Sequence, residues 1–279
     1  MMILIIVFAT GAIYNFVCTA KSRLEVFDMR FLDNPNLPGA PVSLAAVDAR
    51  ISNEAEAALG SMGIELLKVR PHPDLYEAVS GHPDMLLHPI GGELIVYAPG
   101  TDKALLDALT IRGFKLLKGE TELASSYPAD IAYNVARVGG WYFHNLKFTD
   151  PVVKRQLDKC GVEPVHVGQG YSKCSVLPVN EHAILTTDKG IARAAEKKGL
   201  DVLFMADEGA IRLPGLNRGF IGGTGGMAGK SVCVLNGDPN KLDCSGLLAD
   251  FASENDIIIK SLSHGQVTDI GSILPLTTI

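Results

Sequence analysis

The feature that most constrains this chain is a unit of about 50 residues that occurs five times. Each copy contains a pair of residues that favours the start of a helix, because their side-chain oxygens accept hydrogen bonds from the free N–H groups of the first turn. The second residues of these pairs lie 49, 48, 38 and 50 residues apart; they are Asn53, Asp102, Asp150, Asp188 and Asp238. Spacing of this kind is typical of repeat architectures, so we expect five equivalent blocks of structure.

Each predicted helix ends at a residue that favours a left-handed cap, and a short apolar strand follows it. The predicted caps are Gly63, Gly113, Gly161, Gly199 and, less well, Asn255. The predicted strands are Ile64–Val69, Phe114–Leu117, Val162–Val167, Leu200–Met205 and Asp256–Leu262.

A further strand is predicted at the start of each unit, and its last copy stands apart from the rest of its unit. The copies are 82–86, 130–134, 172–176, 223–227 and 269–273. No helix follows residues 269–273, whereas the N-terminal part has a strand at Val42–Val47 with its helix and third strand. We therefore expect the C-terminal strand to pair with the first unit and close a ring, which leaves no free sheet edge between units.

Composition excludes some classes of function. The 279 residues are 47% hydrophobic and 20% charged, so the chain can bury a sizeable core. The net charge is −6 and the basic residues do not cluster, which argues against nucleic acid as a partner. The five cysteines form no pair with metal-ligand spacing. We expect a reduced, cytoplasmic protein with no metal and no cofactor.

Residues 1–28 form an apolar extension, and residues 29–279 are expected to form a single domain without a linker. A signal peptide has a basic residue before its apolar run, and this extension has none. It is short for a membrane span, which needs about 20 residues. It is either a mis-start upstream of Met29 or a signal or anchor; for residues 29–279 we expect no membrane contact.

A ring of five ββαβ units closed by its last strand resembles the pentein fold, a five-bladed α/β-propeller. This is the fold of the guanidino-group modifying enzymes (GME), which include deiminases, dimethylarginine hydrolases and amidinotransferases. The resemblance covers residues 29–279 and rests on the architecture and on two stretches, Gly81–Met85 and Asp269–Leu276. In detail, the chain is most similar to an uncharacterised family of the GME fold.

The resemblance implies a hydrolase with a thiol, an imidazole and carboxylates in a central pocket. A guanidinium is planar and cationic, so carboxylates can bind it in bidentate fashion. A thiolate attacks its central carbon, and a histidine protonates the leaving amine and then activates water. The family's His-x-Asp stretch is matched by His82-Pro83-Asp84. A small cationic guanidine is the implied partner.

The chain departs from the family on the final strand, where Gly271 and Ser272 stand at the usual place of the cysteine. Cys174 holds the corresponding point of the fourth unit, 92 residues after His82, and the family's His-to-Cys step is also about two units. The predicted catalytic residues are therefore Cys174, His82 and Asp84. Asp130, Asp269 and His264 are the predicted substrate-binding residues. The alternative is a non-catalytic pentein that binds an unknown ligand.

Overall fold

The computed structural model describes residues 29–206 and 210–279. The apolar extension over residues 1–28, predicted as a mis-start, signal or anchor, lies outside the described residues. Among the residues that the structure describes, no helix is long and apolar enough to cross a membrane.

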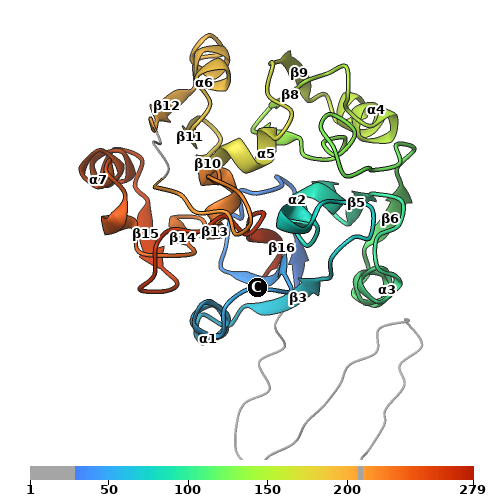
Figure 1. Cartoon of the computed structure of the whole chain (residues 1–279), viewed down its shortest axis with the longest axis horizontal. Coiled ribbons are helices and arrows are strands. Elements are labelled where there is room, and N and C mark those ends of the chain that lie inside the picture. Colours follow the sequence, from blue (N-terminus) through green and yellow to red (C-terminus); the bar gives the residue numbers. More distant parts are fainter. Residues whose placement is uncertain (1–28, 207–209) are drawn as a thin grey trace, which may run out of the picture.

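Five small sheets surround a common centre, as predicted (Figure 1). Three-stranded sheets are built by units two to five, with orders β4-β5-β6, β7-β8-β9, β10-β11-β12 and β13-β14-β15. The first unit has the order β1-β16-β2-β3. The strands are β1 (Arg30–Phe31), β2 (Val42–Asp48), β3 (Glu65–Val69), β4 (Leu87–Gly91), β5 (Leu94–Tyr97), β6 (Lys115–Lys118), β7 (Ala136–Val138), β8 (Trp141–His144), β9 (Glu163–His166), β10 (Val176–Asn180), β11 (Ala183–Thr186), β12 (Asp201–Phe204), β13 (Gly225–Gly229), β14 (Val232–Leu235), β15 (Ile258–Ser261) and β16 (Leu274–Thr278).

The pairing within each unit follows from its ββαβ order. In units two to five the first two strands are joined by a tight turn and pair antiparallel, whereas the third returns through a helix and pairs parallel to the second. The expected closure is confirmed, because β16 pairs antiparallel with β2, placing Leu274 opposite Ala46. On its other edge β16 pairs with β1.

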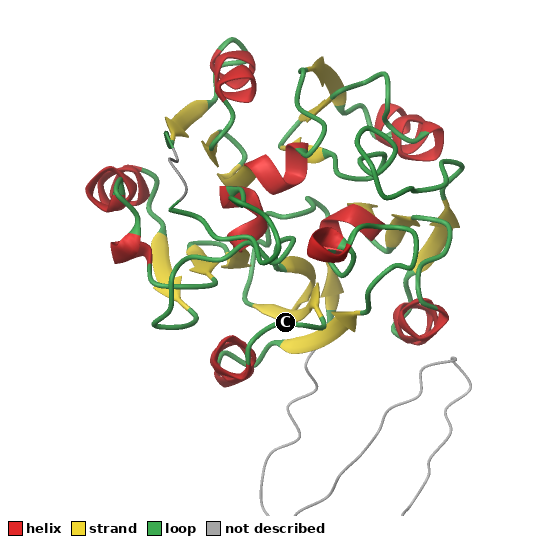
Figure 2. Cartoon of the chain, viewed as in Figure 1, coloured by secondary structure: helices red, strands yellow, loops and turns green. Residues whose placement is uncertain are grey.

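The long helices lie on the outside of the ring, and the shortest ones face its middle (Figures 1 and 2). The outer helices are α1 (Asn53–Ser61), α3 (Lys103–Ile111), α4 (Pro151–Lys159), α6 (Lys189–Glu196) and α7 (Ser245–Glu254). Each buries one face against its sheet; in α3 this face holds Leu105 and Leu109, one turn apart. Burying a leucine of this kind contributes about 2 kcal/mol.

The predicted helix starts and helix ends are confirmed in four of the five units. Ser52, Asp102, Asp150 and Asp188 accept hydrogen bonds from first-turn N–H groups of their helices. Gly63, Gly113, Gly161 and Gly199 all have positive φ. The fifth unit differs: Asp238 caps a separate 3-10 turn, η3 (Pro239–Lys241), and the left-handed residue after α7 is Asp256, not Asn255. The predicted left-handed cap after α7 was therefore wrong by one residue.

The segments predicted as first strands were placed too early, because most of their residues form turns at the centre of the ring. Residues 82–86 and 172–176 largely form the one-turn helices α2 (Pro83–Leu86) and α5 (Ser172–Ser175), and the 3-10 turn η2 (Ile221–Thr224) precedes β13. Their N–H groups serve contacts between units: those of Lys173 and Cys174 both donate to Asn134 Oδ1. Residues with such partners cannot also donate to a sheet ladder.

Asp150 joins the second and third units besides capping α4. Its Oδ1 accepts from Val152 N at 2.8 Å and Val153 N at 3.1 Å. Its Oδ2 accepts from the backbone N–H groups of Glu120 and Thr121, both at 2.8 Å, just after β6. The side chain is fully buried, so no water can replace these bonds.

We expect Asp150→Ala to lower the free energy of unfolding by roughly 3 kcal/mol or more, because it leaves several buried donors without a partner. The matched control is Asp102→Ala, which removes a half-buried cap with one hydrogen bond, from Ala104 N at 3.1 Å, and an ion pair with exposed Arg70 at 3.6 Å. That change should cost about 1 kcal/mol. Denaturant unfolding of both variants measures the difference, and equal losses would contradict a joining role for Asp150.

His144 should make the fold sensitive to acid. Burial lowers its pKa to about 4, and its two ring nitrogens lie 2.7 Å from Thr149 Oγ1 and 2.9 Å from the carbonyl oxygen of Gly170. The unfolded chain takes up a proton near pH 6.5, where the folded state does not, so stability is full above that pH. It is lost as the pH falls towards about 4, by about 3 kcal/mol. Burial, helped by Arg137, also lowers the pKa of His88, to about 3, and it acts in the same direction.

The measurement is the free energy of unfolding between pH 7 and 4. His144→Gln should flatten this dependence, whereas His182→Gln, at an exposed histidine, should not. An unchanged slope in His144→Gln would show that other groups cause the acid sensitivity.

Candidate active site at the centre of the ring

Equivalent positions in the inner turns hold different residues. Cys174 lies two residues before β10, Ser272 two before β16, and Asn134 two before β7. Asp84 and Lys173 both lie three residues before their strands, β4 and β10. The equivalence that the spacing predicted between Cys174 and position 272 is therefore present in the structure.

Hydrogen bonds connect these turns across the ring. Lys173 Nζ donates to Ser272 Oγ at 2.9 Å, and Ser272 Oγ donates to Asp84 Oδ2 at 2.7 Å. Asn134 Nδ2 donates to the carbonyl oxygen of Asp84 at 3.2 Å and to Cys174 Sγ at 3.1 Å. Ser272 Oγ also lies 2.8 Å from the carbonyl oxygen of Gly222. All five units thus take part in one network.

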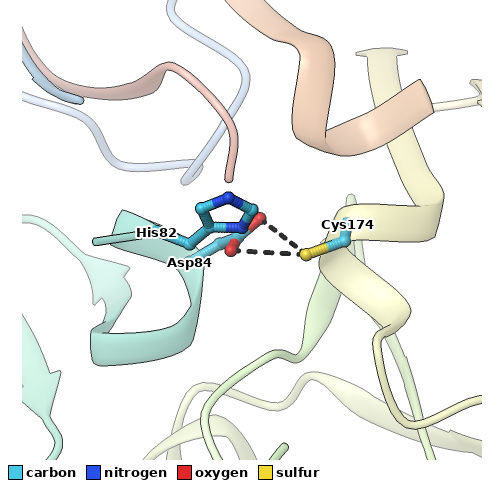
Figure 3. Close-up of side chains that lie close together, drawn as sticks. All are labelled: His82, Asp84 and Cys174. Carbon is cyan, nitrogen blue, oxygen red and sulfur yellow. Dashed lines mark hydrogen bonds between the residues drawn. The ribbon is translucent and has the colours of Figure 1, made fainter. Parts of the chain in front are cut away.

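The three predicted catalytic residues lie together within this network (Figure 3). Their ligating atoms all lie within 4.8 Å of one another, and Cys174 Sγ is 3.3 and 3.4 Å from the two carboxylate oxygens of Asp84. His82, Asp84 and Cys174 are 1%, 2% and 2% exposed. The burial means that a reactant reaches them only through a pocket.

A pocket of about 290 Å³ reaches this cluster. His82, Cys174 and Asp269 provide its polar lining, and Arg218 is an exposed residue of the lining. The remaining lining is aromatic or aliphatic: Tyr76, Val79, Tyr171, Leu213, Leu216 and Phe220. The rings of Tyr171 and Phe220 stack with centroids 6.2 Å apart. A mostly apolar pocket with a few convergent polar groups is the usual form of a small-molecule site.

Asp269 lies beside His82, with Oδ1 3.9 Å from His82 Nδ1. Its position is fixed by backbone N–H groups, because Gly271 N donates to Oδ1 and Phe220 N to Oδ2, both at 2.9 Å. Burial raises the pKa of Asp269 above its ordinary value. Of the predicted substrate-binding residues, this one lines the pocket.

The other two predicted substrate-binding residues lie elsewhere. Asp130 is fully buried and accepts a hydrogen bond from the hydroxyl of Tyr171, so it lies behind the pocket wall. Burial raises the pKa of Asp130 as well. His264 is exposed and is not part of the pocket lining; its backbone N–H donates to Glu54 Oε1 and its carbonyl accepts from Lys241 Nζ.

The local charges set the state of the thiol. Burial, followed by the negative charges of Asp84 and Asp269, raises the pKa of Cys174 well above its ordinary value. The S–H group can donate to Asp84, which is consistent with a protonated thiol in the free protein. Burial lowers the pKa of Lys173, whose ammonium group is nearly inaccessible to solvent.

Three participants were not among the predicted site residues: Lys173, Ser272 and Asn134. Alignment of the inner turns was the signal that could have found them, because it places a lysine and an asparagine in segments that must face the centre. A second pocket, of about 530 Å³, was also not predicted; it shares His82 and Asp269 with the first.

Comparisons with known proteins agree with this architecture. A structure of an amidinotransferase of saxitoxin biosynthesis from Microseira wollei is similar, with a TM-score of 0.51 and 11% identity over 82% of this chain and 91% of that one. Inosamine-phosphate amidinotransferase from Streptomyces griseus is similar over 89% of this chain and 96% of that one, with a TM-score of 0.53 and 12% identity. At this identity the likeness establishes the fold alone, and it confirms the pentein architecture.

Sequence comparison gives a family assignment. No curated protein matches the chain. The model of a family of unknown function (DUF6873) matches residues 46–274, which include all five inner turns but leave out most of β16. The chain belongs to this family of unknown function (DUF6873), and it carries the pentein fold.

Proposed function

We propose that the protein is a guanidino-group modifying enzyme that hydrolyses a C–N bond of a guanidine, with Cys174 as the nucleophile. The observation that supports this best is the convergence of a thiol, an imidazole and the carboxylate of Asp269 at one pocket, with the carboxylate of Asp84 directly behind the thiol. These groups come from three units that are distant in the sequence, and each matches a step of the reaction.

In this proposal Asp84 and Asp269 bind the guanidinium and place its central carbon against Cys174 Sγ. The two carboxylates oppose formation of a thiolate in the free protein. A bound cation offsets their charge, so the thiol ionises only beside its substrate. This explains how a cysteine with a raised pKa can serve as a nucleophile.

When the cation binds, the thiol proton leaves to solvent, and Cys174 Sγ then forms a bond to the guanidinium carbon. His82, in its protonated form, gives a proton to the leaving amine, and the C–N bond breaks. The neutral imidazole then takes a proton from water, the resulting hydroxide adds to the amidino carbon, and the S–C bond breaks. The protonated urea passes a proton to the thiolate, which restores the thiol, and the imidazolium is already restored. The products are a urea and an amine, which takes up the proton released at the start.

The other residues have supporting roles or none in this proposal. Asp130 acts through Tyr171, whose ring it holds in the pocket wall. His264 is outside the proposed mechanism because its side chain lies at an exposed position away from the cluster.

One observation favours the alternative, a binding protein without catalysis. At the position equivalent to Cys174, the final unit has Ser272, which is fully buried and held by Lys173 and Asp84. A chain that uses this position to stabilise its centre, and that buries the thiol of Cys174, could serve to bind a cation instead.

Labelling with a cationic electrophile separates the two functions. We expect a haloacetamidine to modify Cys174 at neutral pH on the order of tenfold faster, or more, than the neutral haloacetamide of the same size. That ratio corresponds to roughly 1.4 kcal/mol of preference for the cation. Exposed Cys160 is the internal control and should show no such preference.

His82→Ala should abolish selective labelling, with His182→Ala as the matched exposed control. Mass spectrometry locates the adduct, and a screen of guanidines for amine release then tests turnover. Equal rates at Cys174 for the two reagents would overturn the enzymatic proposal and favour the binding protein.

Gly271 offers a test of the position of His82. It has φ of 69°, and a Cβ there would lie 2.1 Å from His82 Cβ. Gly63 has a similar φ of 79°, but a Cβ there would have no neighbour within 4 Å. Alanine at either site costs about 1–2 kcal/mol through the left-handed backbone. Gly271→Ala must in addition displace His82.

We therefore expect Gly63→Ala to leave Cys174 labelling unchanged and Gly271→Ala to slow it on the order of tenfold, the effect of about 1.4 kcal/mol. Unfolding curves establish first that both variants are folded. Equal labelling rates in the two folded variants would show that the position of His82 does not matter for the thiol.

A further inference from the structure

The Cys174 cluster has the chemical composition and spacing of a metal site. A thiol, an imidazole and a carboxylate, from Cys174, His82 and Asp84, converge within 4.8 Å (Figure 3). With bonds of about 2.3 Å to sulfur and 2.0–2.2 Å to oxygen, tetrahedral zinc holds these two ligand atoms roughly 3.6 Å apart. The observed separations of 3.3 and 3.4 Å between Sγ and the Asp84 oxygens are close to that value.

An unsatisfied buried atom provides an independent indication of a ligand. His82 Nδ1 is buried and has no hydrogen-bond partner among the residues that the structure describes. Its nearest carboxylate oxygen, Asp269 Oδ1, is 3.9 Å away, which is too far for a hydrogen bond. Leaving a buried polar atom without a partner destabilises the folded protein. Placed beside a thiol and two carboxylates, His82 Nδ1 is suited to interact with a bound cation.

The surrounding hydrogen bonds fix the ligands as outer-shell partners do in metal proteins. Asn134 Nδ2 donates to Cys174 Sγ at 3.1 Å, an interaction that stabilises a thiolate. Asn134 is itself held by the N–H groups of Lys173 and Cys174. Ser272 Oγ orients Asp84 through Oδ2 at 2.7 Å. Both non-histidine ligands are thus oriented by residues from other units.

We propose that His82, Asp84 and Cys174 bind one divalent zinc ion, and that this ion blocks the thiol. Sulfur and imidazole ligands select zinc over magnesium or calcium, which prefer oxygen. The ion enters through the pocket of about 290 Å³, which His82 and Cys174 line, and the fourth position is open to that pocket. The binding site stands on geometry alone; the inhibition rests on the proposed function.

Cobalt provides a spectroscopic test, because a thiolate bound to Co²⁺ gives a charge-transfer absorption band. The full chain is treated with a chelator, dialysed and titrated with Co²⁺, then with Zn²⁺ in competition. We expect about one ion per chain and a band that Zn²⁺ removes. The band should be lost in Cys174→Ser and kept in Cys160→Ser. No band in the wild-type protein, or a band that survives Cys174→Ser, would overturn the site.

A second measurement needs no variant. Zn²⁺ should protect Cys174 of the wild-type chain from the haloacetamidine on the order of tenfold or more, and a chelator should restore labelling. At the zinc concentration that protects Cys174, the labelling rate of exposed Cys160 should not change. If guanidine turnover is found but no zinc binds, this inference fails and the proposed function stands. If zinc binds through Cys174 and the metal-free thiol shows no preference for the cationic reagent, the reverse holds.

Discussion

The hydrogen bonds at the axis of the ring are the interactions on which the rest of the structure depends. Among the strands that the structure describes, each sheet is separate from its neighbours, so no strand ladder runs from one unit to the next. At the centre, Ser272 bonds to Lys173 and Asp84, and Asn134 bonds to Asp84 and Cys174. These polar groups are almost completely buried, so a lost partner would not be replaced by water. The same bonds that hold the five units together also place the thiol and its carboxylate, so stability and the proposed activity depend on one set of contacts.

The charges at this centre support the proposal that it binds a cation. Asp269 is buried in the pocket lining, and Asp84 is buried in the cluster with Cys174. The ammonium group of Lys173 donates a hydrogen bond to Ser272, which in turn bonds to Asp84. Burying like charges is costly without compensation, and a cationic ligand supplies it. Either of the two proposed ligands, a guanidinium or a zinc ion, would offset the negative charge of these buried carboxylates. The mostly apolar wall of Tyr171 and Phe220 strengthens the interaction by excluding water around it.

Most of the architecture could be predicted from the sequence, because caps and glycines at a fixed period are local signals. Ring closure could be predicted because the last predicted strand, at residues 269–273, has no helix after it and the first unit lacks its first strand. The approach of Cys174 to His82 was predictable from their spacing of two units, because the inner turns of all units in a ring face the same centre. The inner turns were mistaken for strands because their hydrogen-bond partners lie in other units. Neither the burial of Lys173 nor the exposure of His264 could be predicted, because each depends on how distant segments meet.

The closure of the ring by β16 has a consequence for biosynthesis. The first unit contains β2 and β3 from near the start of the described chain and β16 from its end. Asp269 and Ser272 belong to the same late segment. During translation four units can leave the ribosome before the first one is complete. The nascent chain therefore carries an unpaired β2 edge and an open centre until its final segment emerges, and chaperones that shield exposed strands would act in that interval.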